Sequence, residues 1–157
     1  MSKLSDPSHL ENHLGYWLRC LSNFVSGSFA EKLATLHISV AQWVVLRTLF
    51  DYDSTTLNEA AHAIGVDKSS LSRMIERLVQ RELVKRAEGK DRRSVSLSLT
   101  AAGRKLVPKL AKLADENDEA FFRSLSLRER EKLLFLIKQL LKANNWDLTT
   151  HGKDRML

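Results

Sequence analysis

Apolar residues recur at three- and four-residue steps along most of the chain, which is the spacing of one face of an α-helix. The pattern predicts helices over residues 9–36, 40–50, 57–64 and 67–81, a long helix that follows Thr100, and a last helix that follows Ser126. Between Leu83 and Gly103 the pattern changes, because three apolar residues alternate with serines over residues 94–99. An alternating run that follows a charged tip predicts a β-hairpin. The expected fold class is therefore mainly α with one small β-hairpin.

Polar residues mark where several of these helices begin and end. A Ser or Thr followed three residues later by Glu or Gln can form a reciprocal capping box. Such pairs precede four apolar-periodic runs: Ser8 with Glu11, Ser39 with Gln42, Thr56 with Glu59, and Ser126 with Glu129. Gly65 ends the third helix, Asp67 caps the fourth, and Pro108 is expected to bend the fifth helix if it lies inside it.

The pattern in the central part of the chain predicts two short helices with a glycine turn between them, followed by the hairpin. Two helices joined in this way form a helix-turn-helix, whose second helix can enter the major groove of DNA. The added hairpin makes the unit a winged helix. The hairpin is expected to pack beside the helix pair and to project its tip.

The positive charge of the chain is concentrated in the same region. The whole chain of 157 residues carries a net charge of +6. Nine cationic and four acidic residues lie between Lys68 and Arg93, a net charge of +5. This distribution is typical of a nucleic-acid-binding surface.

Two stretches, GVDKSSLSRMIERLVQRELVKR and DRRSVSLSLTAAGR, resemble the MarR family of bacterial winged-helix regulators. The wing pattern of that family corresponds here to Asp91, Arg93, Leu99, Thr100 and Gly103. The resemblance implies a homodimer held by the first, fifth and sixth helices. It also implies a repressor that binds pseudo-palindromic operators and is released by a small, often aromatic or phenolic, ligand.

On this basis residues 1–157 are expected to form a single MarR-like domain. Residues 8–36 and 104–146 would form the helical dimerisation region, and residues 39–103 the winged helix-turn-helix. One residue departs from the family pattern, since Glu82 stands where a glycine is usual after the recognition helix. Either Glu82 takes a left-handed conformation at a cost of about 1 kcal/mol, or the turn differs and changes the angle of the wing.

The helix over 67–81 is expected to bury its leucines and to present a polar face to DNA. That face carries Lys68, Ser69, Ser70, Ser72, Arg73 and Arg77. By the resemblance Arg73 contacts bases, where it could pair with a guanine, and the serines are expected to bond phosphates. The alternative is a solvated polar face.

The hairpin tip carries Lys90, Asp91, Arg92 and Arg93. By the resemblance Arg93 enters a minor groove and Asp91 orients it, while Lys90 and Arg92 contact phosphates. At the start of the third helix, Thr56 either exposes backbone N–H groups to a phosphate or simply caps the helix.

By the resemblance, an effector site is expected where the first two helices meet the fifth. Its candidate residues are His13, Trp17, Cys20, Trp43 and Arg47, with Tyr16 nearby. An aromatic wall beside a cation suits an aromatic carboxylate or a phenol. The alternative is that both tryptophans pack in the core or in a dimer interface.

Other chemistry finds little support in the sequence. Some relatives sense hydroperoxides through a cysteine, but Gly15 stands at that position and Cys20 is expected to be a buried thiol. His9 and His13 lack further metal ligands, and no catalytic motif is present, so neither an enzyme, a metal site nor a cofactor is expected. No secretory signal and no apolar run of about 18 residues is found, which favours the cytoplasm. The alternative functions are a protein-binding winged helix and a redox regulator that uses Cys20.

Overall fold

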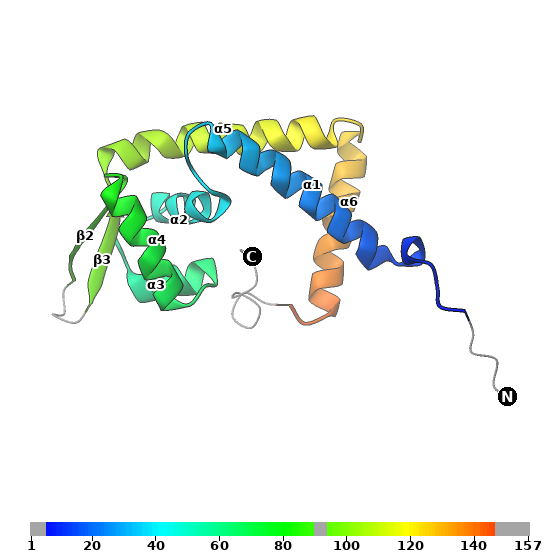
Figure 1. Ribbon diagram of the computed structural model, residues 1–157, viewed down its shortest axis with the longest axis horizontal. Coiled ribbons are helices and arrows are strands. Elements are labelled where there is room, and N and C mark those ends of the chain that lie inside the picture. Colours follow the sequence, from blue (N-terminus) through cyan, green and yellow to red (C-terminus); the bar gives the residue numbers. More distant parts are fainter. Residues whose placement is uncertain (1–5, 90–93, 147–157) are drawn as a thin grey trace.

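The elements of the protein are mostly helical, with one small sheet (Figure 1). A computed structural model describes residues 6–89 and 94–146. The elements in order are η1 (Leu10–Asn12), α1 (Leu14–Ala34), α2 (Val40–Phe50), β1 (Thr55–Thr56), α3 (Leu57–Ile64), α4 (Lys68–Gln80), β2 (Val84–Glu88), β3 (Val95–Leu99), α5 (Ala101–Phe122) and α6 (Leu127–Ala143). The predicted fold class, a mainly helical chain with a β-hairpin wing, is confirmed.

Three of the four predicted capping boxes form. At the starts of α2, α3 and α6, the hydroxyl of the cap residue accepts a hydrogen bond from the backbone N–H of the residue three positions later. The side chain of that later residue accepts one from the backbone N–H of the cap residue. The box predicted at Ser8 is wrong. Ser8 instead bonds the ring of His13, with 3.0 Å between Oγ and Nε2. His13 has an extended backbone (φ −95°, ψ 118°), so residues 10–12 form only a 3₁₀ turn and α1 begins at Leu14.

The sheet has three antiparallel strands in the order β1-β3-β2. Val84 pairs with Leu99 and Glu88 pairs with Val95, as the alternating pattern predicted for a hairpin. The N–H of Gly89 donates to the carbonyl of Ser94 over 2.8 Å and closes the hairpin below its tip. β1 was not predicted from the sequence, because a strand of two residues is too short to show an alternating pattern.

The core lies where α2, α3, α4 and the sheet meet the C-terminal half of α1 and the N-terminal half of α5. Its fully buried side chains include Leu33, Leu46, Leu71, Leu97 and Leu110. In Figure 1, α5 runs along one side of the molecule, and α2, α3 and α4 lie beneath its first half. The N-terminal half of α1 extends away from this core, and α6 leaves from the far end of α5.

One buried polar residue joins α1 to α5. Asn117 of α5 is 3% exposed. Its Oδ1 accepts from the Ser28 hydroxyl over 2.7 Å, and its Nδ2 donates to the Val25 carbonyl over 3.3 Å. Burying an amide without partners is unfavourable, so these bonds are what makes the position tolerable.

Glu82 adopts the left-handed conformation that glycine usually provides, with φ 56°. Its N–H donates to the Val79 carbonyl over 2.9 Å, and the N–H of Leu83 donates to the Leu78 carbonyl over 3.0 Å. The Glu82 carbonyl accepts from the Thr100 hydroxyl over 2.6 Å. Of the two alternatives, the left-handed conformation is therefore the one that forms, and these three bonds hold the strained helix end in place.

Replacing Glu82 by glycine should relieve that strain. We expect Glu82→Gly to raise the free energy of unfolding by up to about 1 kcal/mol, since only the Cβ penalty of the left-handed region is removed. Urea unfolding measures the change. Glu82→Gln is the control, because it removes the charge and keeps the Cβ, and it should leave the stability nearly unchanged. A glycine variant less stable than the control would contradict the argument.

Candidate nucleic-acid interface

The α3–α4 pair holds one face of α4 in the core and leaves the opposite face exposed. Gly65, with φ 77°, ends α3 in the left-handed region and turns the chain toward α4. Leu71, Ile75 and Leu78 are each 0% exposed. Since they occupy one side of the helix, the residues between them point away from the core. This is the arrangement expected of a helix-turn-helix.

The exposed face of α4 carries the cations predicted for DNA binding. Lys68, Ser69, Arg73 and Arg77 are exposed, whereas Ser72 is half-buried. The cations span the helix from its first turn to its last turn. The predicted side chains of α4 thus lie on its outward half, with the exception of Ser70.

Ser70 is engaged inside the first turn of α4. Its N–H donates to Asp67 Oδ1 over 2.9 Å, and its hydroxyl donates to Asp67 Oδ2 over 2.6 Å. These bonds from Ser70 hold the pKa of the Asp67 carboxyl below its ordinary value, and the nearby charge of Arg73 acts in the same direction. Because its proton is used here, the Ser70 hydroxyl is not free to donate to a phosphate unless the cap opens.

The wing begins beside α4. Arg86 of β2 lies against the recognition helix, with Nη1 at 3.7 Å from Glu76 Oε1 and Nη2 at 3.5 Å from Ser72 Oγ. Arg86 therefore places a positive charge beside the acidic residue of this face. The predicted tip residues Lys90, Asp91, Arg92 and Arg93 lie outside the described residues.

Two cations counted in the basic segment are used within the protein. Arg86 contacts α4, and Arg81 donates to the carbonyls of His37 and Leu36 at the end of α1. The sequence does not distinguish these arginines from DNA-facing ones, because their partners are distant in sequence or carry no distinctive pattern. Among the described residues of the segment, Lys68, Arg73, Arg77 and Lys85 remain as exposed cations outside these two contacts.

Thr56 acts as the cap of α3. Its hydroxyl accepts from the N–H of Glu59 over 3.2 Å and donates to Glu59 Oε2 over 2.9 Å, and its own N–H donates to the same oxygen over 2.8 Å. The hydrogen bonds from Thr56 hold the pKa of Glu59 below its ordinary value. Both donors of Thr56 are thus satisfied by Glu59.

The chain is similar in sequence to known bacterial regulators. The MarR family model matches residues 38–95, which include α2, α3, α4 and the hairpin. The chain is also 27% identical over 139 residues to the HTH-type transcriptional repressor NicR of Pseudomonas putida, covering 88% of each chain.

The fold agrees over nearly the whole chain. A mutant MarR from E. coli complexed with operator DNA is 27% identical, with a TM-score of 0.76 over 85% of this chain and 99% of that chain. The chain therefore resembles MarR-family regulators both in sequence over residues 38–95 and in fold. A second MarR-like structure, of Bordetella bronchiseptica BpsR, concerns regulation of its DNA binding by 6-hydroxynicotinic acid. It is 28% identical, with a TM-score of 0.76 over 86% of this chain and 98% of that chain.

Members of the MarR family are DNA-binding regulators and not enzymes, which agrees with the function class expected from the sequence. Among the described residues, no group of three or more His, Cys, Asp or Glu side chains is placed to hold a metal ion. In the same part of the chain, no helix is long and apolar enough to span a bilayer.

The residues predicted for an effector pocket of the MarR type are divided between two parts of the subunit. Trp17 is 53% exposed and its indole N–H donates to the Glu11 carbonyl over 2.8 Å. Trp43 packs edge-to-face on Phe29, with ring centroids 6.3 Å apart. Trp17 and Phe29 are twelve residues apart on α1, which is about 18 Å along the helix. Trp17 and Trp43 therefore lie beside different parts of α1 within one subunit, and the single effector site stays a prediction.

The remaining effector candidates are also divided between the start of α1 and α2. His13 and Cys20 lie near Trp17, and the Cys20 thiol is half-buried. A hydrogen bond with Cys20 raises the pKa of Tyr16. Arg47 lies on α2, where it forms an ion pair with Asp51 at 2.7 Å, so this cation faces solvent beside its own helix end.

The Asp67 cap should give the recognition helix a pH-dependent stability. A carboxyl whose folded pKa is lowered stabilises the fold above its unfolded pKa of about 3.9, and this contribution is lost as the pH falls through the folded value. We therefore expect Asp67→Asn to be less stable than the wild type at pH 7, with the difference shrinking below about pH 4. Urea unfolding at several pH values measures this.

Ser70 provides the control for that measurement, because its two bonds are the main cause of the lowered pKa. In a Ser70→Ala background, the difference between Asp67 and its Asn replacement should be smaller at pH 7. A difference that is independent of both pH and Ser70 would show that the charge of Asp67 has no part in the cap.

Proposed function

We propose that the protein is a homodimeric, sequence-specific regulator that binds a pseudo-palindromic operator in double-stranded DNA and represses transcription from it. The observation that carries this proposal is the exposed cationic face of α4, held outward by a fully buried face and placed beside the wing. The similarity to the E. coli MarR crystallised with operator DNA supports it. Repression is supported by the similarity to the repressor NicR.

In this proposal α4 enters the major groove. Arg73 reads a guanine through its two-donor fork, and Lys68 and Arg77 contact phosphates. Ser69 and Ser72 bond phosphates with their hydroxyls, and Ser70 accepts or donates only within the Asp67 cap. Glu76 is compensated by Arg86, so the face of α4 keeps a net positive charge.

The wing contacts the minor groove in this proposal. Arg93 enters the groove, Asp91 orients it, and Lys90 and Arg92 contact phosphates. Thr56 lies at the start of α3, where the N-terminal end of the helix adds a positive partial charge toward a phosphate. Together residues 39–103 form the DNA-binding region.

The dimerisation region is proposed to be residues 8–36 and 104–146. None of the described side chains of α6 is buried in the subunit, although the helix is rich in leucine. An amphipathic helix gains most of its stability by burying its apolar face, so α6 needs a partner. Large apolar side chains are exposed along both regions: Leu10, Leu14, Trp17, Leu18, Leu21, Phe24, Leu127, Leu134, Phe135, Leu136, Ile137, Leu140 and Leu141.

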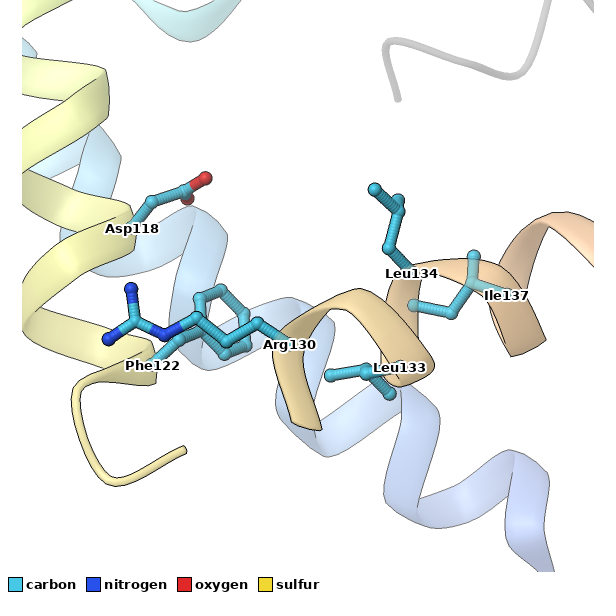
Figure 2. Close-up of a pocket in the computed structure, with 6 residues that line it drawn as sticks. All are labelled: Asp118, Phe122, Arg130, Leu133, Leu134 and Ile137. Atoms are coloured by element: carbon cyan, nitrogen blue, oxygen red, sulfur yellow. The ribbon is translucent and has the colours of Figure 1, made fainter. Parts of the chain in front are cut away.

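The junction of α5 and α6 has a cavity that fits this view (Figure 2). Its volume is about 250 Å³, and it is lined mainly by Phe122, Leu133, Leu134 and Ile137. Arg130, which also lines it, is held by two bonds to Glu119 at 2.6 and 3.2 Å. Because this cavity is open and lined by apolar side chains, we expect an apolar side chain of a second subunit to fill it.

A small aromatic or phenolic effector is the third part of the proposal. It is supported by BpsR, whose DNA binding is regulated by 6-hydroxynicotinic acid. Of the candidate residues, His13 precedes α1 directly, and Trp17 and Cys20 lie in its N-terminal half, within the proposed dimerisation region. Isothermal titration of the dimer with salicylate and 6-hydroxynicotinate tests this part.

The proposed base contact is tested with DNA selected by the wild type from a random pool. We expect Arg73→Ala to lose about 1–3 kcal/mol of preference for the selected site over random DNA. Arg93→Ala should weaken binding to both DNAs to a similar extent, because a minor-groove cation reads shape and charge. Fluorescence anisotropy at several salt concentrations gives both affinities.

Equal losses on selected and random DNA for Arg73→Ala would contradict its assignment as a base contact. Wild-type binding that hardly changes with salt would contradict the DNA-binding proposal itself. Several phosphate contacts per subunit require a steep fall in affinity as salt rises. Binding that is insensitive to salt would instead favour a protein-binding role for the winged helix.

The proposed dimer is tested at α6. Leu140 is 51% exposed in the subunit, so Leu140→Glu should fold and yet raise the dissociation constant of the dimer about tenfold or more. Gln139→Glu, at the neighbouring exposed position, adds the same charge and is the control. Analytical ultracentrifugation measures both. A monomeric wild type, or equal effects of the two variants, would count against this interface.

A further inference from the structure

Three helix ends meet at the C-terminal end of α4. The first is the end of α1, where His37 has φ 55° and the N–H of Ile38 donates to the Leu33 carbonyl over 3.2 Å. This turn directs the carbonyls of Leu36 and His37 away from α1. Carbonyls at a helix end carry partial negative charge and need partners from elsewhere in the protein.

Arg81 supplies that partner. It is the residue that ends α4, and its Nη1 donates to the His37 carbonyl over 2.5 Å while its Nη2 lies 3.4 Å from the Leu36 carbonyl. A guanidinium presents two parallel donors in a fixed geometry, which suits two successive carbonyls. The contact joins residues 44 and 45 positions apart in the sequence.

The start of α5 holds the same end of α4 from the other side. The Thr100 hydroxyl donates to the Glu82 carbonyl over 2.6 Å, and the Thr100 N–H donates to the Leu83 carbonyl over 3.1 Å. Gly103 leaves so little room that a Cβ there would lie 2.2 Å from the Leu83 oxygen. The end of α4 is thus fixed between α1 and α5, the two helices that lead to the proposed dimer interface.

We propose that Arg81 is a positioning residue for operator binding, which sets the angle of the recognition helix relative to α1 and α5 and so the spacing between the two recognition helices of the dimer. This inference rests on the proposed function. Arg81 acts through the carbonyls of Leu36 and His37, not through contact with DNA.

The geometry of α4 explains why this end matters. A helix of 13 residues is about 20 Å long. A tilt of about 10° at one end therefore moves the other end by about 3.5 Å, close to the 3.4 Å rise of one base pair. Arg73, the proposed base-reading residue, lies eight residues or about 12 Å from Arg81, so the same tilt shifts it by about 2 Å, more than half a base-pair step.

Arg77 offers a matched comparison. It lies four residues before Arg81, is exposed, and belongs to the proposed phosphate-contacting face. A phosphate contact and a positioning contact differ in what their loss changes. Loss of a phosphate contact reduces the slope of log affinity against log salt concentration by about one unit per contact. Loss of a positioning contact leaves this slope unchanged and weakens the preference for one half-site spacing.

The experiment uses the palindrome selected by the wild type, together with copies in which the two half-sites are moved one base pair closer or further apart. Affinities for all three are measured for the wild type, Arg81→Gln, Arg81→Lys and Arg77→Gln across a range of salt concentrations. Circular dichroism and thermal unfolding establish that each variant is folded.

The wild type should lose affinity about tenfold or more when the half-sites are moved, since contacts in one half-site are lost. Arg81→Gln should keep the wild-type salt slope and lose most of this spacing preference. Arg81→Lys, which keeps the charge but not the fork, should lie between them. Arg77→Gln should reduce the slope and keep the spacing preference.

The inference is overturned if Arg81→Gln lowers the salt slope as Arg77→Gln does and keeps the spacing preference, because Arg81 is then a phosphate contact. It is also overturned if Arg81→Gln changes neither quantity. A wild type that selects no palindrome overturns the proposed function and this inference with it. A wild type that selects one while Arg81→Gln keeps its spacing preference overturns the inference alone.

Discussion

The burial of one face of α4 is the constraint on which the remaining arrangement depends. Leu71, Ile75 and Leu78 are fully buried in the core, where α4 packs against α3 and β2. Burying side chains of this size contributes about 1.5–3 kcal/mol each, far more than a single exposed ion pair. The rotation of α4 about its axis is therefore set by the core, and the cations that alternate with these residues are turned outward as a consequence.

Much of the fold could be predicted because its signals are local. The capping boxes at Ser39, Thr56 and Ser126 use residues three apart, and the strand over 95–99 shows its own alternation. The box at Ser8 failed because the same four-residue pattern competes with a side-chain contact to His13. A capping pattern shows that a segment is able to form a capping box, but the box forms only if the backbone after the cap residue is helical.

The candidate site was less predictable because several of its side chains are determined by distant partners. The outward face of α4 followed from helical spacing alone, and it was found. Arg81 and Arg86 have the same composition signal as Arg73 and Arg77, but their carbonyl and carboxylate partners emerge only in the fold. The effector candidates on α1 and α2 were grouped because the resemblance implies a pocket where the first two helices meet the fifth, whereas the length of α1 separates Trp17 from Trp43. The net charge of the central segment indicated the DNA-binding surface. Which of its cations make internal contacts and which face solvent is seen only in the structure.

The amide of Asn117 limits how a signal can travel through this molecule. Its bonds to Ser28 and Val25 match one alignment of α1 on α5. Sliding one helix past the other by a turn would leave a buried amide unsatisfied, at a cost of about 1–3 kcal/mol. Translation along the helix axes is therefore disfavoured, while pivoting about the Asn117 contact keeps its hydrogen bonds. The Asn117 contact therefore fixes the register of α1 on α5, from which both helices extend to the proposed dimer interface.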